Sequence, residues 1–172
     1  MNALSLTSRT GKTYNHGKMD GILRIAKNKK AHFHYTVEET VECGIVLEGS
    51  EVKSIRSGNI SFPDAFAEIS PSSEVWLKNF HISPYTYASV FLHEPDRPKK
   101  LLLHRAEIKR LQRKTMEKGY TLVPLEFYIK KGKVKLLLGL CKGKKLYDKR
   151  ADIRERDVSR DLQREFAHRQ DG

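Results

Sequence analysis

The sequence has little cysteine and no long apolar run, and each scarcity excludes a class of protein. Only Cys43 and Cys141 occur among the 172 residues, which is too few for a disulfide framework and lacks the spacing of a metal site. We therefore expect a protein of the reducing cytoplasm, with neither a bound metal nor another cofactor. The longest apolar runs, 101–103 and 136–138, are far too short to span a membrane, and the first residues lack the apolar core of a secretory signal.

Signatures of nucleotide-dependent and hydrolytic enzymes are missing as well. Neither a Gly-rich dinucleotide fingerprint nor a nucleophile elbow occurs in the chain. Gly139 and Gly143-Lys144 resemble a phosphate-binding loop, but the spacing is one residue short and Lys145 stands where Ser or Thr would hold the metal. These absences favour a binding protein over an enzyme.

Histidine-based RNA cleavage is the enzymatic alternative. Such a nuclease needs an acid and a base on either side of one phosphate, with a cation for the developing charge. His32 and His34 share a face of a predicted strand, and further imidazoles are available at His81, His93 and His104. These histidines form no recognisable motif, so surface or RNA-contacting roles outweigh catalysis.

What the sequence does have is positive charge. Its 33 Lys and Arg outnumber 21 Asp and Glu, which gives a net charge of +12 and an isoelectric point near 9.7. Such an excess repels itself in a compact protein unless a polyanion lies against it. Nucleic acid, an anionic membrane surface and acidic proteins are the candidate partners. A membrane is the weakest of the three, because no segment is long and apolar enough to enter one.

The chain divides into three regions by composition. Residues 1–23 are polar without a hydrophobic period, which is typical of a disordered N-terminal extension. Residues 24–142 carry nearly all the periodic apolar pattern and are long enough for one ordinary domain. Residues 143–172 form a basic tail in which the apolar content falls sharply.

Alternating apolar residues predict β-strands throughout the central region. From His32 to Leu47 the odd positions are mostly apolar, which predicts one long strand with a buried face and a bend at Gly44. Further strands are predicted over 65–69 and 74–77, which are joined by the turn residues 71–73, over 80–82, and over 121–141 as a hairpin that turns at Gly132.

Two helices are predicted between these strands. The first runs from Ser50, its N-cap, to Arg56, with Gly58 as the stop signal. The second spans 104–118, with Gly119 at its end, and buries Ile108, Leu111 and Thr115. The proline-containing segment 83–100 is expected to lack regular structure.

This order of elements indicates a mainly β fold with helices. The simplest architecture is an OB-like, partly open antiparallel β-barrel, with one prominent helix before the final hairpin. A simple α+β sandwich is the alternative.

The positive charge is concentrated in two places. Between Arg97 and Lys118 there are nine Lys or Arg and only two Glu, and Arg105, Lys109 and Arg113 share one helix face. The basic segment 25–30 precedes two histidines and a tyrosine. Lysines beside rings suit RNA loops, where bases stack while phosphates are neutralised. A solvated helix face is the alternative, although such a face normally mixes signs.

The tail has a helical period but little to bury. Its apolar stripe consists of Ile153, Val158, Leu162 and Phe166. Such a helix is not stable alone in water because helix nucleation is costly. We expect a tail that is disordered when free and helical when bound to a partner. A terminal helix docked on the barrel is the alternative.

Eight short motifs carry a resemblance to one known family. They are Asn28-Lys29-Lys30-Ala31, Glu42-Cys43-Gly44, Gly49-Ser50-Glu51-Val52-Lys53-Ser54, His81-Ile82-Ser83-Pro84-Tyr85, Lys100-Leu101-Leu102-Leu103-His104, Lys118-Gly119-Tyr120-Thr121, Lys142-Gly143-Lys144-Lys145 and Asp148-Lys149-Arg150. In this order, from about residue 25 to residue 160, they resemble the SsrA-binding protein family, SmpB.

The resemblance implies an OB-type barrel that binds the tRNA-like domain of transfer-messenger RNA (tmRNA) and accompanies it to stalled ribosomes for trans-translation. It implies tmRNA contacts at Asn28 as a bidentate amide, at Glu42 as an acceptor, and at Leu102 as an apolar platform. The basic residues expected beside them are Lys29, Lys30, Arg105 and Lys109.

The resemblance also implies a ribosome-binding tail. Its expected residues are Lys142, Gly143, Lys144, Lys145, Tyr147, Asp148, Lys149 and Arg150. This segment would contact small-subunit ribosomal RNA in the decoding centre, with the Tyr147 ring on a base, and continue as a helix along the empty message channel. Elongation factor Tu would join through the aminoacylated tmRNA. A ribosomal protein or general translation factor is the non-enzymatic alternative.

Overall fold

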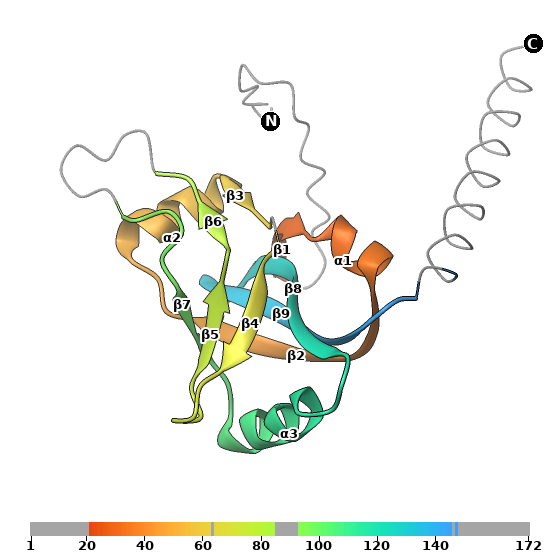
Figure 1. Ribbon diagram of the computed structural model, residues 1–172. Coiled ribbons are helices and arrows are strands. Elements are labelled where there is room, and N and C mark those ends of the chain that lie inside the picture. The colour runs from red at the N-terminus through yellow and green to blue at the C-terminus, as the bar shows by residue number, and fades with distance from the viewer. Residues whose placement is uncertain (1–20, 63, 85–92, 146, 148–172) are drawn as a thin grey trace, which may run out of the picture.

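The strands of the central region curl into a partly open antiparallel barrel with three short helices around it (Figure 1). The computed structural model describes residues 21–62, 64–84, 93–145 and 147. In chain order the elements are β1 (Ile22–Lys27), α1 (Lys29–His34), β2 (Tyr35–Ile45), α2 (Gly49–Arg56), β3 (Ile60–Ser61), β4 (Phe66–Ile69), β5 (Val75–Lys78), β6 (His81–Ile82), β7 (Lys99–Leu102), α3 (Arg105–Thr115), β8 (Tyr120–Lys130) and β9 (Lys133–Gly143).

Strand β8 closes the barrel because it pairs along both of its edges. The main sheet has the order β1-β8-β4-β5-β7-β2-β9, and β8 pairs with β9 as well. Two of the strand pairings that complete the barrel are short. Strands β4 and β8 meet only at Ala67 and Leu122, and β2 meets β7 at just two residue pairs. The predicted mainly β, partly open antiparallel barrel, with one prominent helix before the final hairpin, is confirmed.

The barrel interior is filled by side chains from the strands and from the segments that join them. The rings of Phe80 and Phe127 stack with centroids 4.6 Å apart, and Phe62 packs against both. Strand β9 buries Leu136 and Leu138 in the same cluster. Burying each such side chain contributes about 1.5–3 kcal/mol, so this core stabilises the fold. No helix in the described part of the chain is long and apolar enough to cross a bilayer.

The first long strand begins later than predicted. Residues 29–34 form helix α1, and β2 starts at Tyr35. The reason is local: the Asn28 side chain caps the helix by accepting a hydrogen bond from the Ala31 N–H at 3.1 Å. Beyond this point the expected alternation holds, since Val41 and Cys43 are buried. A β-bulge lies between Val37 and Glu39, where the apolar stripe is interrupted.

Strand β1 was not predicted from the sequence. Its residues Ile22 and Leu23, which the composition placed in the N-terminal extension, pair with Lys130 and Ile129 of β8. The strand is an edge strand of only six residues, so its apolar pattern is too short to stand out. The other residues assigned to the extension, 1–20, lie outside the described part of the chain.

Two other boundaries also differ from the sequence prediction. Glu48 rather than Ser50 caps helix α2, and its N–H donates to the Glu51 carboxylate at 2.7 Å. The segment predicted to be irregular, 83–100, includes the start of β7, where Lys99 and Lys100 pair with β5. Lysines are weak strand formers, and only the pairing with a neighbouring strand decides their conformation.

The predicted final hairpin is confirmed, but the alternation of side chains in its first strand, β8, is interrupted. Lys131 and Gly132 both have positive φ, as a tight two-residue turn requires. In β8 a bulge between Pro124 and Glu126 shifts the alternation. As a result, Val123 and Leu125 pack in a small cluster beside α1 rather than in the main core.

Candidate nucleic-acid interface

Strand register places residues from five strands in one row across the outer face of the barrel. Arg24, Tyr128, Lys135, Gly44 and Leu102 lie opposite one another on β1, β8, β9, β2 and β7. On each of these strands at least one residue next to the row in sequence is buried in the core or packs against it, so the row faces outward. Neighbouring strands lie about 4.7–4.9 Å apart, and the row therefore spans on the order of 20 Å.

Glu42 lies two residues before Gly44 on the same face and is surrounded by donors. Its Oε2 accepts hydrogen bonds from Tyr128 Oη at 2.7 Å and from Lys130 Nζ at 2.9 Å, and Lys135 Nζ lies 3.7 Å from Oε1. The bonds from Lys130 and Tyr128 hold the pKa of Glu42 below its usual 4.5. The expected acceptor is therefore an ionised carboxylate on the surface.

Leu102 provides an exposed apolar side chain beside this charge. It is 53% exposed and lies across from Gly44, where an added Cβ would be 3.2 Å from the Leu102 Cβ. A groove of about 440 Å³ runs beside these two residues and is also lined by Lys133 and Lys135. We call Glu42, Leu102, Tyr128, Lys130 and Lys135 the outer-face cluster. A carboxylate, an apolar surface and lysines side by side are the groups that RNA recognition uses.

The Asn28 side chain is engaged within the protein. It is 7% exposed, its Oδ1 caps α1, and its Nδ2 donates to the Pro124 carbonyl at 3.0 Å. An amide that contacts backbone at both ends is poorly placed to make two further bonds to a base. Its evident effect is to hold α1 on β8, which leaves Lys29 and Lys30 exposed at the start of the helix.

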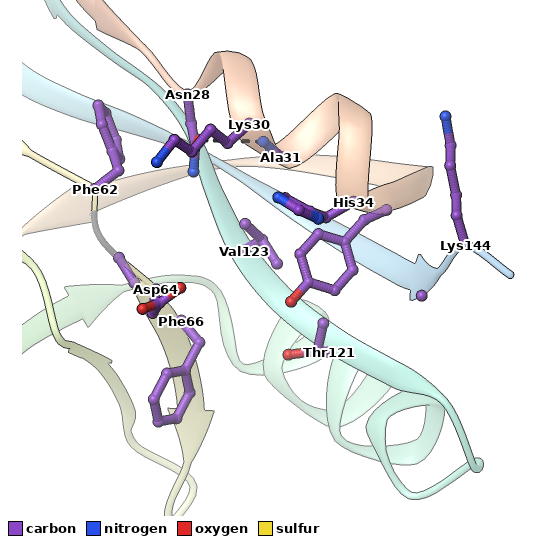
Figure 2. Close-up of a pocket in the computed structure, with 13 residues that line it drawn as sticks. Asn28, Lys30, Ala31, His34, Phe62, Asp64, Phe66, Thr121, Val123 and Lys144 are labelled. Atoms are coloured by element: carbon purple, nitrogen blue, oxygen red, sulfur yellow. Dashed lines mark hydrogen bonds between the residues drawn. The ribbon is translucent and has the colours of Figure 1, made fainter. Parts of the chain in front are cut away.

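A pocket of about 560 Å³ lies beside α1 (Figure 2). Figure 2 shows Lys30 and His34 of α1 on one side and Asp64 and Phe66 on the other, with Val123 of β8 between them. Its lining includes the predicted site residues Asn28, Lys30, Gly143 and Lys144, but the sequence did not predict the pocket itself. Its lining comes from segments far apart in the chain, and no local pattern links residues 28–35 to residues 62–66.

Helix α3 carries the predicted basic row at a separate place on the barrel from α1 (Figure 1). Arg105, Lys109 and Arg113 are exposed on it. Arg110 pairs with Glu39 of β2, and Lys114 pairs with Glu117 at 3.1 Å. The structure therefore does not bring the α3 row together with the α1 lysines, although α3 begins only three residues after Leu102.

The start of the predicted tail belongs to the barrel. Lys142 and Gly143 end β9, opposite Thr36 and Tyr35 of β2. Lys144 continues this attachment, since its N–H donates to the His34 carbonyl and its Nζ to the His32 carbonyl, both at 3.0 Å. The prediction missed this because the pairing partner, rather than the local apolar content, sets the end of the strand.

Beyond this attachment, Lys145 and Tyr147 are exposed, with Tyr147 at 81%. The remaining predicted tail residues, Asp148, Lys149 and Arg150, lie outside the described part of the chain, as does the predicted tail helix.

Three of the histidines that the nuclease alternative named have other surroundings than predicted. His32 and His34 lie on helix α1 rather than on a strand face. His93 is buried, with Nδ1 3.0 Å from Ser50 Oγ and Nε2 3.0 Å from the Ile82 carbonyl oxygen, so neither ring nitrogen is free for proton transfer. Within the described ranges, no three His, Cys, Asp or Glu side chains gather closely enough to hold a metal ion.

In comparisons with known proteins, the chain matches one protein family. A family model described as SmpB protein matches residues 25–168. The chain is 72% identical to the SsrA-binding protein of Treponema denticola over 142 residues, 83% of this chain and 92% of that protein. It is 52% identical to the SsrA-binding protein of Aquifex aeolicus over 151 residues, 87% of this chain and 96% of that protein.

A solved structure supports the same assignment. It is described as "tmRNA-SmpB: a journey to the center of the bacterial ribosome" and matches with a TM-score of 0.61 at 43% identity. The match covers 73% of this chain and 86% of the other.

Proposed function

The chain belongs to the SmpB family of SsrA-binding proteins, and we propose that it is a non-enzymatic, cytoplasmic adaptor that binds tmRNA and delivers it to stalled ribosomes for trans-translation. The observation that carries this proposal is the outer-face cluster, in which an ionised carboxylate, an exposed leucine and two lysines share one face of the barrel.

Each group in the cluster has a distinct chemical task toward the tRNA-like domain of tmRNA. The Glu42 carboxylate accepts hydrogen bonds from base or ribose donors, and the Leu102 side chain offers an apolar surface to a base. Lys130 and Lys135 neutralise nearby phosphates. Such contacts recognise loops, ribose and backbone shape, because the deep major groove of an A-form helix is closed to side chains.

Other basic residues extend this surface. We assign phosphate contacts to Lys29 and Lys30, which Asn28 presents by anchoring α1, and to Arg105 and Lys109 at the start of α3. These contacts lie at separate places on the barrel, which suits a folded RNA rather than a short single strand.

The segment after β9 is the proposed ribosome-binding part. It leaves the barrel beside α1, where Lys144 is anchored, and exposes Lys145 and Tyr147. We propose that this segment contacts small-subunit ribosomal RNA in the decoding centre and that the following residues occupy the empty message channel. Elongation factor Tu would then be met only through the aminoacylated tmRNA.

The test is titration of the tRNA-like domain of tmRNA with purified variants. We expect Glu42→Gln to weaken binding about tenfold, because it removes a charged acceptor, and Leu102→Ala to weaken it similarly. Glu68→Gln is the matched control, since Glu68 is an exposed strand carboxylate paired with Lys78 on β4 and β5, away from the cluster. Wild-type affinity of both cluster variants would contradict the proposal.

Incubation with labelled structured RNA separates the adaptor from a nuclease. Stable complexes without fragments are expected from the adaptor, whereas accumulation of fragments would contradict its non-enzymatic role. Stable binding to ribosomes purified from cells without tmRNA would instead indicate a general translation factor.

A further inference from the structure

The two oxygens of the Glu42 carboxylate have unequal surroundings. Oε2 accepts two hydrogen bonds, from Tyr128 Oη at 2.7 Å and Lys130 Nζ at 2.9 Å. Among the residues that the structure describes, the ion-pair partner of Oε1 is Lys135 Nζ at 3.7 Å, which is beyond hydrogen-bond distance. The side chain of Glu42 is 37% exposed. One oxygen is therefore held by the protein, and the other still has lone pairs available to a ligand.

Tyr128 is the rigid member of this arrangement. It is 8% exposed in β8, whereas the Lys130 side chain is 41% exposed and longer. Strand β9 separates β8 from β2, so the Tyr128 and Glu42 side chains together bridge two strand spacings, or about 10 Å. A ring fixed by the sheet places its hydroxyl more reproducibly than a flexible ammonium does.

Charges on β8 and β9 favour this geometry. Lys130 of β8 and Lys135 of β9 face Glu42, while Glu126 of β8 is paired with Arg24 of β1 at 2.9 Å. Burial and the carboxylate of Glu42 raise the pKa of Tyr128, so its hydroxyl stays protonated and donates. A protonated tyrosine facing an ionised carboxylate can only donate, which keeps Glu42 an acceptor.

We propose that Tyr128 is a positioning residue that fixes Oε2 of Glu42, so that Oε1 is presented to N–H or O–H donors of a bound RNA. This inference rests on the proposed function of the outer-face cluster. It assigns a separate role to each residue: Tyr128 orients the Glu42 carboxylate, Glu42 contacts the RNA, and Lys130 and Lys135 supply positive charge.

The barrel contains a matched control. Tyr120, also in β8, donates from its hydroxyl to both oxygens of Glu38 in β2 at 2.8 Å. This second pair also connects β8 and β2, but no lysine hydrogen bond to Glu38 accompanies it in the described residues. Tyr120→Phe and Tyr128→Phe therefore each remove one Tyr–Glu bond between the same two strands while the ring is retained.

The experiment measures the Kd of the full-length protein for the tRNA-like domain of tmRNA. Tyr128→Phe should weaken binding about threefold to tenfold, the equivalent of one net hydrogen bond, and Tyr120→Phe should change it less than twofold. In a Glu42→Gln background, Tyr128→Phe should have no further effect. As the pH falls, protonation of Glu42 should weaken RNA binding. In Tyr128→Phe this acid limit of binding, the pH at which affinity begins to fall, should move to a higher pH, because the Glu42 carboxylate loses a donor.

Each outcome decides a separate statement. If Glu42→Gln binds like wild type, the proposed contact of the outer-face cluster with RNA fails. If Glu42→Gln weakens binding but Tyr128→Phe does not, the positioning role is overturned and the contact stands. Equal losses from Tyr128→Phe in both backgrounds, with an unmoved acid limit, would indicate general loss of packing and would also overturn the positioning role.

Discussion

At the residue scale, the RNA-binding potential of the barrel depends on how single charges are paired. Arg110, Lys114 and Lys100 are each paired with a glutamate, which reduces their availability to phosphate. Glu42 is the reverse case, because two lysines and a tyrosine surround one carboxylate. The cluster keeps excess positive charge around the acceptor, so an RNA bound there as proposed would meet both in one place.

The lowered pKa of Glu42 predicts a pH-dependent contribution to stability. Since the folded pKa lies below 4.5, the ion pairs stabilise the protein above pH 4.5, and this is lost as the pH falls through the lowered value. Lys130→Met removes the largest cause of the shift. We expect its melting temperature to lie slightly below wild type at neutral pH and to converge with it in acid, as thermal unfolding at several pH values would measure. A gap that widens in acid would contradict this.

The two cysteines illustrate a residue property that follows from burial alone. Burial raises the pKa of Cys43 to about 12 and that of Cys141 to about 11. Thiolates rather than thiols are the reactive form, so both side chains are unreactive in the folded barrel. Their role is to fill space between strands.

At the element scale, β9 holds the barrel together through close contact with its neighbours. Contact is close at Gly139, because an added Cβ would lie 2.7 Å from Leu125 Cδ1 and 3.0 Å from Cys141 Sγ. At Gly143, four residues along the same strand, an added Cβ would meet nothing within 4 Å.

These two glycines give a matched pair of substitutions. Gly139→Ala should lower the free energy of unfolding by about 1–3 kcal/mol through overpacking, as urea unfolding would measure. Gly143→Ala should leave it nearly unchanged. Equal effects at the two positions would show that backbone freedom rather than packing makes glycine necessary at Gly139.

Elements with a long, regular apolar period could be predicted, and those set by a local cap or a distant partner could not. The hairpin 121–141 and the helix after Leu103 were found because their patterns repeat over three or more turns or strand pairs. Helix α1 was missed because the single side chain of Asn28 starts it within an otherwise alternating stretch. The bulge after Pro124 was missed because it appears only in the pairing with β9.

The candidate site was predictable in part. Lys29, Lys30, Arg105 and Lys109 were predicted from charge density, and Glu42 and Leu102 were predicted from resemblance to a family. Neither route identified Tyr128, Lys130 or Lys135 as neighbours of Glu42. They lie more than eighty residues away in the chain, and only the strand register brings them together.

At the scale of the whole molecule, the boundary between barrel and tail determines which truncation is informative. Removing residues after Lys145 should leave affinity for the tRNA-like domain within about twofold and abolish rescue of stalled ribosomes, because the proposed decoding-centre contacts are lost. Binding assays together with a tagging assay on stalled ribosomes would measure both. Retained rescue would contradict the tail mechanism.

Truncation after Cys141 is the instructive comparison. It also removes the last pairs of β9 with β2 and the Lys144 bonds to α1. Each lost hydrogen bond costs about 0.5–1.5 kcal/mol, so this variant should be less stable and bind tmRNA less well. Equal stability of the two truncated proteins would show that residues 142–145 do not support the barrel.

The distributed positive charge predicts a steep salt dependence of RNA binding. Each phosphate neutralised contributes a slope of about −0.7 to −0.9 to the plot of log affinity against log salt. The double variant Arg105→Gln/Lys109→Gln should reduce the magnitude of the slope by up to about 2, as titrations at several salt concentrations would show. An unchanged slope would mean that α3 faces solvent in the complex.

The sequence by itself determined the class of fold and indicated a polyanionic partner, because strand alternation and net charge are local or additive properties that do not depend on where distant residues lie. Tertiary structure alone decided which charges remain available, where the barrel ends and which residues surround Glu42. Those features depend on the register between strands far apart in the chain, and register is set by core packing and bulges that no single segment encodes.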